Sequence, residues 1–312
     1  MGLSEIFKKQ GGVKLLKQYW KSGTFFTAIG QFLLLGKSRT ALEILRLSVS
    51  LKTKQKLEKK YRKKLEEFDR NWEEEPHQRS DKVWICWFQG MDSAPEVVQK
   101  CYHSVVERMP NREIVVITYD NMMDYVQFPM FIQDKMERRI ISGAHLADLL
   151  RLELLLRYGG TWIDATVYCS GSDIPDYMLN SELFMFQNLK PGRDGHAIVV
   201  SNWFITAYSN NKILAAVRYL LYAYWETNNE LLDYYVFHDF FQIIIDKYDK
   251  EWNKVVPFNN ATPHIILLRL FETYDEEIWD AVMKQTPFHK LTYKFDNEKK
   301  RIEGTYYRKL FG

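Results

Sequence analysis

An aspartate and an arginine stand three residues apart in a leucine-rich stretch, as Asp148 and Arg151. Residues at i and i+3 share one face of a helix, so both side chains can point at a single ligand. A carboxylate accepts hydrogen bonds from sugar hydroxyls, and a guanidinium donates to hydroxyl or phosphate oxygens. The pair therefore suits a nucleotide sugar, although an Asp-x-x-Arg pair in isolation is more often a structural ion pair.

The residues that follow predict a tight turn into a strand that ends in a carboxylate. Gly159 and Gly160 come where the apolar repeat stops, and glycine enters the left-handed backbone region without a Cβ penalty. Residues 161–163 favour a strand, and Asp164 follows at the strand end, where α/β proteins usually place ligand chemistry. A carboxylate there can hold a divalent cation against a diphosphate leaving group.

The pattern over residues 147–166 resembles the capsular polysaccharide synthesis glycosyltransferases, which are related to the DXD-containing sugar transferases and to the glucosylating bacterial toxins. The resemblance is specific through about residues 83–205 and fainter beyond. It implies an α/β fold of the GT-A type, a Rossmann-like domain that binds a nucleotide sugar. It also implies that Asp148 and Arg151 contact the donor sugar and that Asp164 binds a divalent cation, Mn²⁺ or Mg²⁺.

Thr166 stands where these relatives carry the second Asp of the metal motif. A hydroxyl is a poorer cation ligand than a carboxylate, so we expect either a weak metal site or one that draws a ligand from elsewhere. His264, in a Pro-His pair that similar capsule enzymes share, is the replacement ligand to test first. His238, beside Asp239, is a second histidine for proton transfer or metal binding. For either histidine a structural role is the more common outcome.

The flanking segments predict the rest of a nucleotide-binding sheet. Residues 83–88 and 112–119 have the apolar character of buried strands, with an amphipathic helix after Pro95 between them. Residues 182–186 and 197–204 read as further strands, and helices follow near residues 211–225 and 233–248. Strand, helix, strand is the beginning of a nucleotide-binding α/β sheet.

Five residues in or after these strands are the predicted donor contacts outside the helix. The resemblance implies that Trp87 stacks on the nucleobase and that Asp120 or Asn121 lies near the nucleoside, with Gln89 and Asn202 also facing the donor. An aromatic residue in a first strand is more often part of the core, and an Asn in an apolar run is as often a satisfied core residue.

Charge is distributed unevenly along the chain. Residues 1–70 carry 17 Lys and Arg against 6 Asp and Glu, a net charge of +11, and the remaining residues carry a net charge of −8. The apolar run at residues 25–35 is short of the roughly 20 residues that a membrane-spanning helix needs. It also starts late for a signal peptide and precedes no convincing cleavage site. We expect neither a transmembrane segment nor a signal peptide.

Basic amphipathic helices around a short apolar hairpin are typical of a surface anchor on an anionic membrane, where each Lys or Arg contributes about 1 kcal/mol. We predict that residues 1–75 form such an arm, which holds a cytoplasmic protein at the inner face of the bacterial cell membrane. The alternatives are a helical hairpin that packs on the catalytic domain and an RNA-binding arm. No nucleic-acid partner is expected, because the rest of the chain is acidic.

Length and composition fit one catalytic domain behind this arm. A chain of 312 residues that is 46% hydrophobic and 15% aromatic can bury a sizeable core. The polar segment 73–80 predicts the boundary and places the domain at residues 80–312. Three cysteines without paired or zinc-like spacing favour reduced thiols. The sequence has no P-loop, G-x-S-x-G or H-E-x-x-H motif.

These observations predict a hexosyltransferase in bacterial capsule synthesis. The donor would be a nucleotide sugar, first of all a UDP-sugar, and the acceptor a lipid-linked or growing glycan. The related families retain the anomeric configuration, which needs no enzyme nucleophile if the leaving diphosphate helps to deprotonate the acceptor. Two alternatives stay open at this point: a sugar-1-phosphate transferase, and an inactive glycosyltransferase-like scaffold in a capsule assembly complex.

Overall fold

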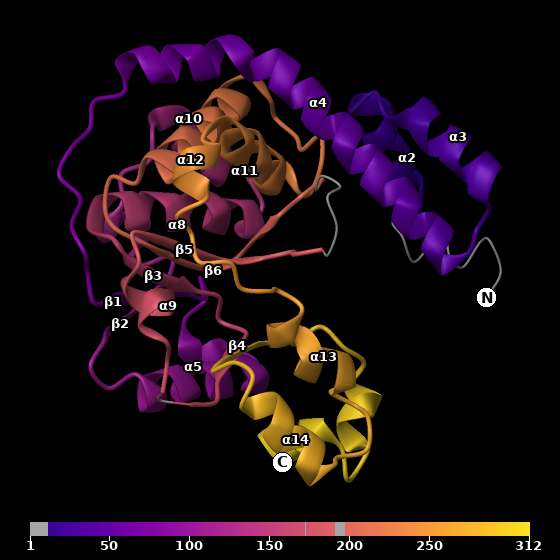
Figure 1. The fold of residues 1–312 in the computed structure, drawn as a ribbon, viewed down its shortest axis with the longest axis vertical. Helices are drawn as coiled ribbons and strands as arrows, with labels where there is room; N and C mark the ends of the chain where they lie inside the picture. Colours follow the sequence, from indigo (N-terminus) through magenta and orange to yellow (C-terminus); the bar gives the residue numbers. More distant parts are fainter. Residues whose placement is uncertain (1–11, 172, 191–196) are drawn as a thin grey trace.

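The computed structural model describes residues 12–171, 173–190 and 197–312 (Figure 1). Its helices are α2 (Gly12–Lys21), α3 (Phe25–Leu35), α4 (Arg39–Asn71), α5 (Glu96–Arg108), α6 (Met122–Tyr125), α7 (Met130–Glu137), α8 (Gly143–Tyr158), α9 (Asp176–Asn180), α10 (Lys212–Thr227), α11 (Val236–Lys247), α12 (Asp249–Trp252), α13 (Ile265–Arg269), α14 (Glu276–Met283) and α15 (Tyr306–Phe311). Its strands are β1 (Lys82–Cys86), β2 (Glu113–Ile117), β3 (Gly160–Ile163), β4 (Val167–Cys169), β5 (Leu183–Gln187), β6 (Val200–Ala207) and β7 (Phe288–Lys290).

The central sheet has five strands in the order β2-β1-β3-β6-β5. Strands β2 and β3 run parallel to β1, whereas β6 runs antiparallel to both β3 and β5. The carboxyl ends of β1 and β3 therefore lie at the same edge as the beginning of β6. This edge brings together Trp87, Asp164 and Asn202, and the predicted α/β class is confirmed.

Helix α8 carries Asp148 and Arg151 through the interior of the domain. Ten of its residues are buried, and the helix packs between α10 and the strands β1, β3 and β6. It ends at Gly159, whose φ of 69° is the left-handed value that glycine adopts readily. Gly160 has a φ of 99°, and a Cβ there would lie 2.3 Å from the carbonyl oxygen of Lys82 on the neighbouring strand. The two glycines let the chain reverse tightly into β3.

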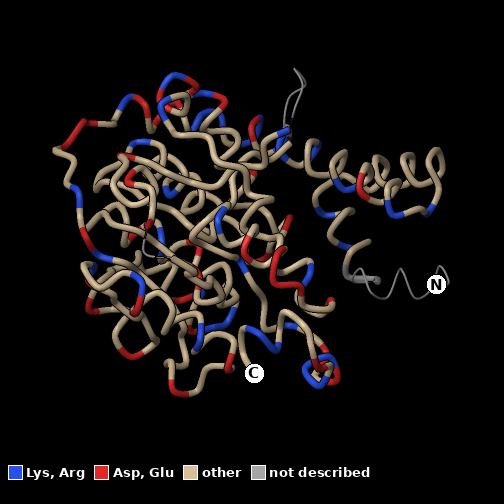
Figure 2. The backbone as a smooth tube through the Cα atoms, turned by 60° about the horizontal axis from the view of Figure 1, so that its bottom comes forward, with Lys and Arg blue, Asp and Glu red and all other residues tan. Residues whose placement is uncertain are grey.

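The predicted arm of residues 1–75 has two structurally different parts. The second half of α4 belongs to the main hydrophobic core through Leu57, Tyr61, Leu65 and Phe68, and it packs against α10 and α11. The first half carries a hairpin of α2 and α3 that extends beyond the body, with basic residues along it (Figures 1 and 2). The end of α2 contacts the body through the Lys21–Glu230 ion pair. Residues 1–11 lie outside the described residues. Packing on the domain and projection from it thus both occur within one long helix.

A second, smaller sheet and the C-terminal helices lie against the carboxyl edge of the central sheet (Figure 1). Strand β4 pairs antiparallel with β7, with Val167 opposite Lys290 and Cys169 opposite Phe288. Helices α13 and α15 share a core with α5 that includes Val97, Ile266 and Tyr306. Among the described helices, none combines the length and the apolar character that crossing a membrane requires.

Candidate active site

A cavity of about 1670 Å³ opens at the carboxyl edge of the sheet. Its walls come from the segment after β1, from α8, from the ends of β3 and β6, and from the segment around β7. The inner face of the arm contributes as well, through Tyr19 on α2 and Arg46 on α4. The cavity therefore extends from the interior of the domain to the basic hairpin, and it is large enough for a nucleotide sugar together with part of an acceptor.

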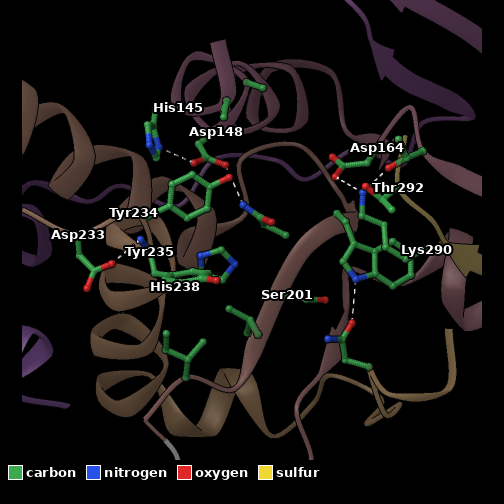
Figure 3. A pocket seen from close by; sticks show the side chains of 18 of the residues that line it. His145, Asp148, Asp164, Ser201, Asp233, Tyr234, Tyr235, His238, Lys290 and Thr292 are labelled. Atoms are coloured by element: carbon green, nitrogen blue, oxygen red, sulfur yellow. Dashed lines mark hydrogen bonds and ion pairs between the residues drawn. The ribbon is translucent and has the colours of Figure 1, made fainter. Parts of the chain in front are cut away.

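Asp148 lies at the centre of a polar network in this cavity. Its Oδ1 accepts a hydrogen bond from the Asn202 side-chain amide at 2.8 Å and lies 3.3 Å from Nη2 of Arg151. Its Oδ2 lies 3.4 Å from Nδ1 of His145. Asp148 is buried, so these three partners hold a carboxylate that solvent does not stabilise. Figure 3 shows Tyr234 beside this carboxylate.

Arg151 connects this network to the end of β3. Its Nε donates to the Ala147 carbonyl at 3.1 Å, its Nη1 donates to the Asn202 carbonyl, and its Nη2 lies 3.8 Å from Oδ1 of Asp164. The guanidinium carbon lies 4.8 Å from the centre of the Trp162 ring. These contacts fix a buried cation in one orientation, as recognition of a diphosphate requires.

Asp164 follows β3 and faces the cavity. Its backbone N–H donates to the Trp203 carbonyl at 2.8 Å, and its Oδ1 accepts from Nε1 of Trp162 at 3.0 Å. Burial by itself raises the pKa of this carboxyl, but the positive charges of Lys290 and Arg151 outweigh it, and the pKa lies below its ordinary value. Asp164 is therefore ionised at neutral pH.

Lys290 occupies the position beside Asp164 where the predicted cation would bind. Its Nζ lies 3.0 Å from Oδ2 of Asp164 and 2.5 Å from Oγ1 of Thr166 (Figure 3). The predicted metal residues Asp164 and Thr166 thus hold an ammonium group. Across the three described stretches of the chain, no group of three or more His, Cys, Asp and Glu side chains converges where it could hold a metal ion.

His264, the predicted replacement ligand, also lines the cavity. Its Nδ1 lies 2.7 Å from the Asn260 carbonyl, and its ring meets Trp203 edge to face at 5.9 Å. Burial lowers the pKa of His264, and Lys290 lowers it further against the opposing hydrogen bond of Asn260. A neutral imidazole follows, positioned by the loop before η2 (Thr262–His264).

His238 lies on the opposite wall, on α11, in the same view as Tyr234 and Tyr235 (Figure 3). Burial lowers the pKa of this imidazole to about 4, so it carries no charge at neutral pH. Tyr234 is 58% exposed and Tyr235 is 50% exposed. They place aromatic surface at the mouth of the cavity, where a sugar ring can stack.

The predicted nucleotide contacts divide into two groups. Trp87 and Gln89 line the cavity, and the Trp87 ring meets Tyr293 edge to face at 5.3 Å. Asp120 and Asn121 lie outside it. The Asn121 amide closes the turn after β2, because its Oδ1 accepts from the Thr118 N–H at 2.8 Å and its Nδ2 donates to the Val116 carbonyl at 2.9 Å. The end of β2 nevertheless lies beside the cavity, because the Tyr119 N–H donates to the carbonyl of Phe88, a lining residue, at 2.9 Å. A place near the nucleoside therefore stays a prediction for Asp120 and Asn121.

The chain matches the family described as "Capsular polysaccharide synthesis protein" over residues 39–310. It belongs to that family. This membership confirms the family predicted from the Asp-x-x-Arg and Gly-Gly pattern and, with it, the expected enzyme class of glycosyltransferase. The match begins at the first residue of α4, so it includes the long helix and excludes the α2–α3 hairpin.

A solved structure titled "PaToxG Glycosyltransferase" aligns with 86% of this chain and 98% of its own, at 15% sequence identity and a TM-score of 0.37. No curated protein matches the chain.

Sequence reasoning missed Lys290, the residue in closest contact with the predicted metal pair. It is separated by 126 positions from Asp164 and stands in a short Phe-His-Lys segment that resembles no motif. Only the pairing of β7 with β4 brings it to the site. The cysteines, in contrast, are free thiols as expected, and burial raises the pKa of Cys86, which lines the cavity, to about 12. Cys86 is therefore not a nucleophile at neutral pH.

Proposed function

We propose that this protein transfers a hexose from a nucleoside diphosphate sugar, first of all a UDP-sugar, to a hydroxyl of a lipid-linked or growing glycan. One observation carries the proposal: Asp148, Arg151, Asn202 and Asp164 form one connected polar network on the wall of a single large cavity. Trp87 lies on the same cavity, at the end of β1. The cleft thus offers a carboxylate for the sugar hydroxyls, a guanidinium for the diphosphate and an indole for the base.

Each group has a role that its surroundings favour. Asp148 accepts hydrogen bonds from donor-sugar hydroxyls, since His145, Asn202 and Arg151 keep its oxygens oriented. Arg151 donates to the diphosphate, and Trp87 stacks on the base. In the transfer, the bond from the anomeric carbon to the diphosphate oxygen breaks and its electron pair stays on the diphosphate. The acceptor hydroxyl oxygen bonds to that carbon, and its proton passes to the departing diphosphate.

We assign no catalytic base and propose that transfer retains the anomeric configuration, as in the related families. A diphosphate that leaves and receives the acceptor proton on the same face of the sugar returns the original anomeric configuration. Asp164 is held at 3.8 Å from Arg151 and 3.0 Å from Lys290, so it serves to position these two cations.

The test is turnover of a panel of UDP-, GDP-, CMP- and dTDP-sugars, with product analysis by mass spectrometry and by the anomeric NMR coupling. We expect one nucleotide class to be hydrolysed slowly without acceptor, and Asp148→Asn to lose at least 100-fold of this rate. A product that carries a phosphodiester would establish sugar-1-phosphate transfer instead. Failure of every donor to bind or react would establish the scaffold alternative.

For the arm, we propose peripheral binding to an anionic membrane at the inner face of the bacterial cell membrane. Trp20, Phe26, Leu33 and Leu34 are 66%, 78%, 77% and 80% exposed on the α2–α3 hairpin. Lys17, Lys37 and Arg39 are exposed on the same hairpin and at the start of α4. Apolar side chains between cations suit an interface of acyl chains and anionic headgroups. The cavity reaches this hairpin at Tyr19, which would admit a lipid-linked acceptor.

Vesicle flotation tests this proposal. We expect wild-type protein to bind vesicles that contain phosphatidylglycerol and not pure phosphatidylcholine, and 1 M NaCl to weaken the binding. A variant with Phe26, Leu33 and Leu34 changed to Ser should lose it, whereas Leu268→Ser, at an exposed apolar residue on α13, should not. Equal binding by the triple variant would contradict the proposal, and sugar transfer to a soluble acceptor would be unaffected by that result.

A further inference from the structure

The pairing of β7 with β4 places Lys290 at the donor site. Strand β7 places Lys290 opposite Val167, and the next residue, Leu291, donates its N–H to the Thr166 carbonyl at 2.8 Å. Phe288, two positions earlier, is fully buried. The side chain of Lys290 is itself only 19% exposed. The strand pairing fixes the backbone of Lys290, and the ion pair with Asp164 places its ammonium group in the cleft.

The ammonium group of Lys290 has three N–H donors, and Asp164 and Thr166 accept two of them. The third is available to a ligand in the cavity that Lys290 lines. Arg151 stands on the other side of Asp164, with its Nη2 3.8 Å from Oδ1. A diphosphate seated over Asp164 would thus meet a positive charge on each side.

This arrangement does not fit a divalent cation. Mg²⁺ is usually bound by one or two carboxylates together with waters and substrate phosphates. This position offers one carboxylate and one hydroxyl, and both already accept hydrogen bonds from the Lys290 ammonium. A cation between Asp164 and Thr166 would have to displace Lys290 or lie against its charge. His264, the remaining nitrogen ligand expected here, uses Nδ1 for the Asn260 carbonyl and keeps Nε2 free of hydrogen bonds to the described residues, so this histidine does not oppose a cation. The group that opposes one is the ammonium of Lys290, 3.0 Å from Asp164.

We propose that Lys290 replaces the divalent cation of the site, so that its ammonium group binds the donor diphosphate and stabilises it as the leaving group without a metal. The proposal deepens the transferase function and rests on it for the identity of the ligand. This proposal explains why Thr166 stands at the position of the second Asp. Its hydroxyl accepts a hydrogen bond from the ammonium group without adding a second negative charge. One carboxylate balances one lysine at this position.

The experiment measures UDP binding by isothermal titration calorimetry, once with EDTA and once with Mn²⁺. We expect wild-type affinity to be the same within about threefold in both buffers. Lys290→Met keeps the length of the side chain and removes its charge, and should weaken UDP binding about 10- to 100-fold. Lys284→Met, at an exposed lysine directly after α14, should bind as wild type. Melting curves establish that each variant is folded.

A second variant makes the test independent of a simple loss of binding. Lys290→Asp places another carboxylate beside Asp164 and Thr166. In a titration with Mn²⁺ and no nucleotide, this variant should bind the metal and the wild-type protein should not. Mn²⁺ should then restore UDP binding to Lys290→Asp but not to Lys290→Met. Restoration of this kind would show that the lysine occupies the position of the cation.

A tenfold or greater gain in wild-type UDP affinity with Mn²⁺ would overturn the proposal, and so would full UDP affinity in Lys290→Met. Stoichiometric Mn²⁺ binding by wild type that Asp164→Ala removes would also overturn it, even if sugar transfer were established. Conversely, metal-independent UDP binding that needs Lys290, without turnover of any donor, would contradict the transferase and support the assignment of Lys290.

Discussion

The guanidinium of Arg151 lies over the ring of Trp162, 4.8 Å from its centre. The indole N–H of the same tryptophan donates to Asp164 at 3.0 Å. One buried aromatic side chain therefore orients both a cation and a carboxylate of the candidate site. Stacking of this kind requires a planar guanidinium, which a lysine at the same position cannot provide.

Replacement of Arg151 by Lys should consequently lower kcat/KM for the donor by at least 100-fold. The charge is kept, but the fork that reaches Asp148, Asp164 and the Asn202 carbonyl is lost. Initial rates at several donor concentrations measure this effect. Arg157→Lys, at the exposed end of α8, is the matched control and should retain the wild-type rate. Equal rates for the two variants would refute a role for the guanidinium in transfer.

Trp87→Ala should weaken binding of UDP by about 10- to 100-fold, because base stacking on an aromatic ring contributes about 1–3 kcal/mol. Titration calorimetry with UDP and with ribose 5-phosphate separates the base from the rest of the ligand. We expect a loss of affinity for UDP and little change for ribose 5-phosphate. Trp20→Ala, at an exposed tryptophan on the arm, controls for removal of an indole. An equal loss for both ligands would mean that Trp87 supports the cleft without contacting the base.

The sequence was informative wherever chemistry and local structure coincide. Asp148 and Arg151 could be placed on one helix face, and Gly159 on its end, because helix periodicity and the left-handed glycine are local properties. Asp164 at the end of β3 followed from strand propensity and the diglycine turn. The many leucines of α8 correctly predicted that this helix is buried.

The remaining features depend on contacts between distant segments. Lys290 reaches Asp164 only through the β4–β7 pair, and no spacing rule predicts a pairing across more than 100 residues. The resemblance implied that Asp120 or Asn121 lies near the nucleoside, and the hydrogen bond by which the Asn121 amide closes the turn after β2 was not part of that expectation. The division of α4 between core and arm was equally invisible, since the apolar positions at Leu57 and Tyr61 are embedded in a lysine-rich stretch.

Gly160→Ala should lower the free energy of unfolding by about 3 kcal/mol or more. The backbone there has a φ of 99°, and the added Cβ would lie 2.3 Å from the Lys82 carbonyl oxygen, so both strain and overlap oppose it. Urea unfolding followed by circular dichroism measures the change. Gly30→Ala on α3 is the control, because its Cβ would meet nothing within 4 Å and alanine favours a helix. A destabilisation under 1 kcal/mol at Gly160 would mean that β1 and β3 separate easily.

Asp239 on α11 should make stability depend on pH. Its side chain is fully buried, and neither carboxyl oxygen has a hydrogen-bond partner among the described residues. Burial, reinforced by Asp233 and opposed by Lys54, raises the pKa of this carboxyl well above its ordinary value. The folded protein therefore keeps a proton that the unfolded chain loses above about pH 4. The contribution of protonated Asp239 to the free energy of unfolding is complete below that pH. It is lost as the pH rises through the pKa that Asp239 has in the folded protein.

The amide in Asp239→Asn cannot ionise. The free energy of unfolding of this variant should therefore increase relative to that of the wild type as the pH rises from 5 to 8. Within the window between the two pKa values, the gain is about 1.4 kcal/mol for each pH unit. Urea unfolding of both proteins at several pH values measures it. Asp280→Asn, at an exposed position on α14, is the control for replacing a carboxyl by an amide. A constant difference for Asp239→Asn would mean that the buried carboxyl has the same pKa in the folded and unfolded chain.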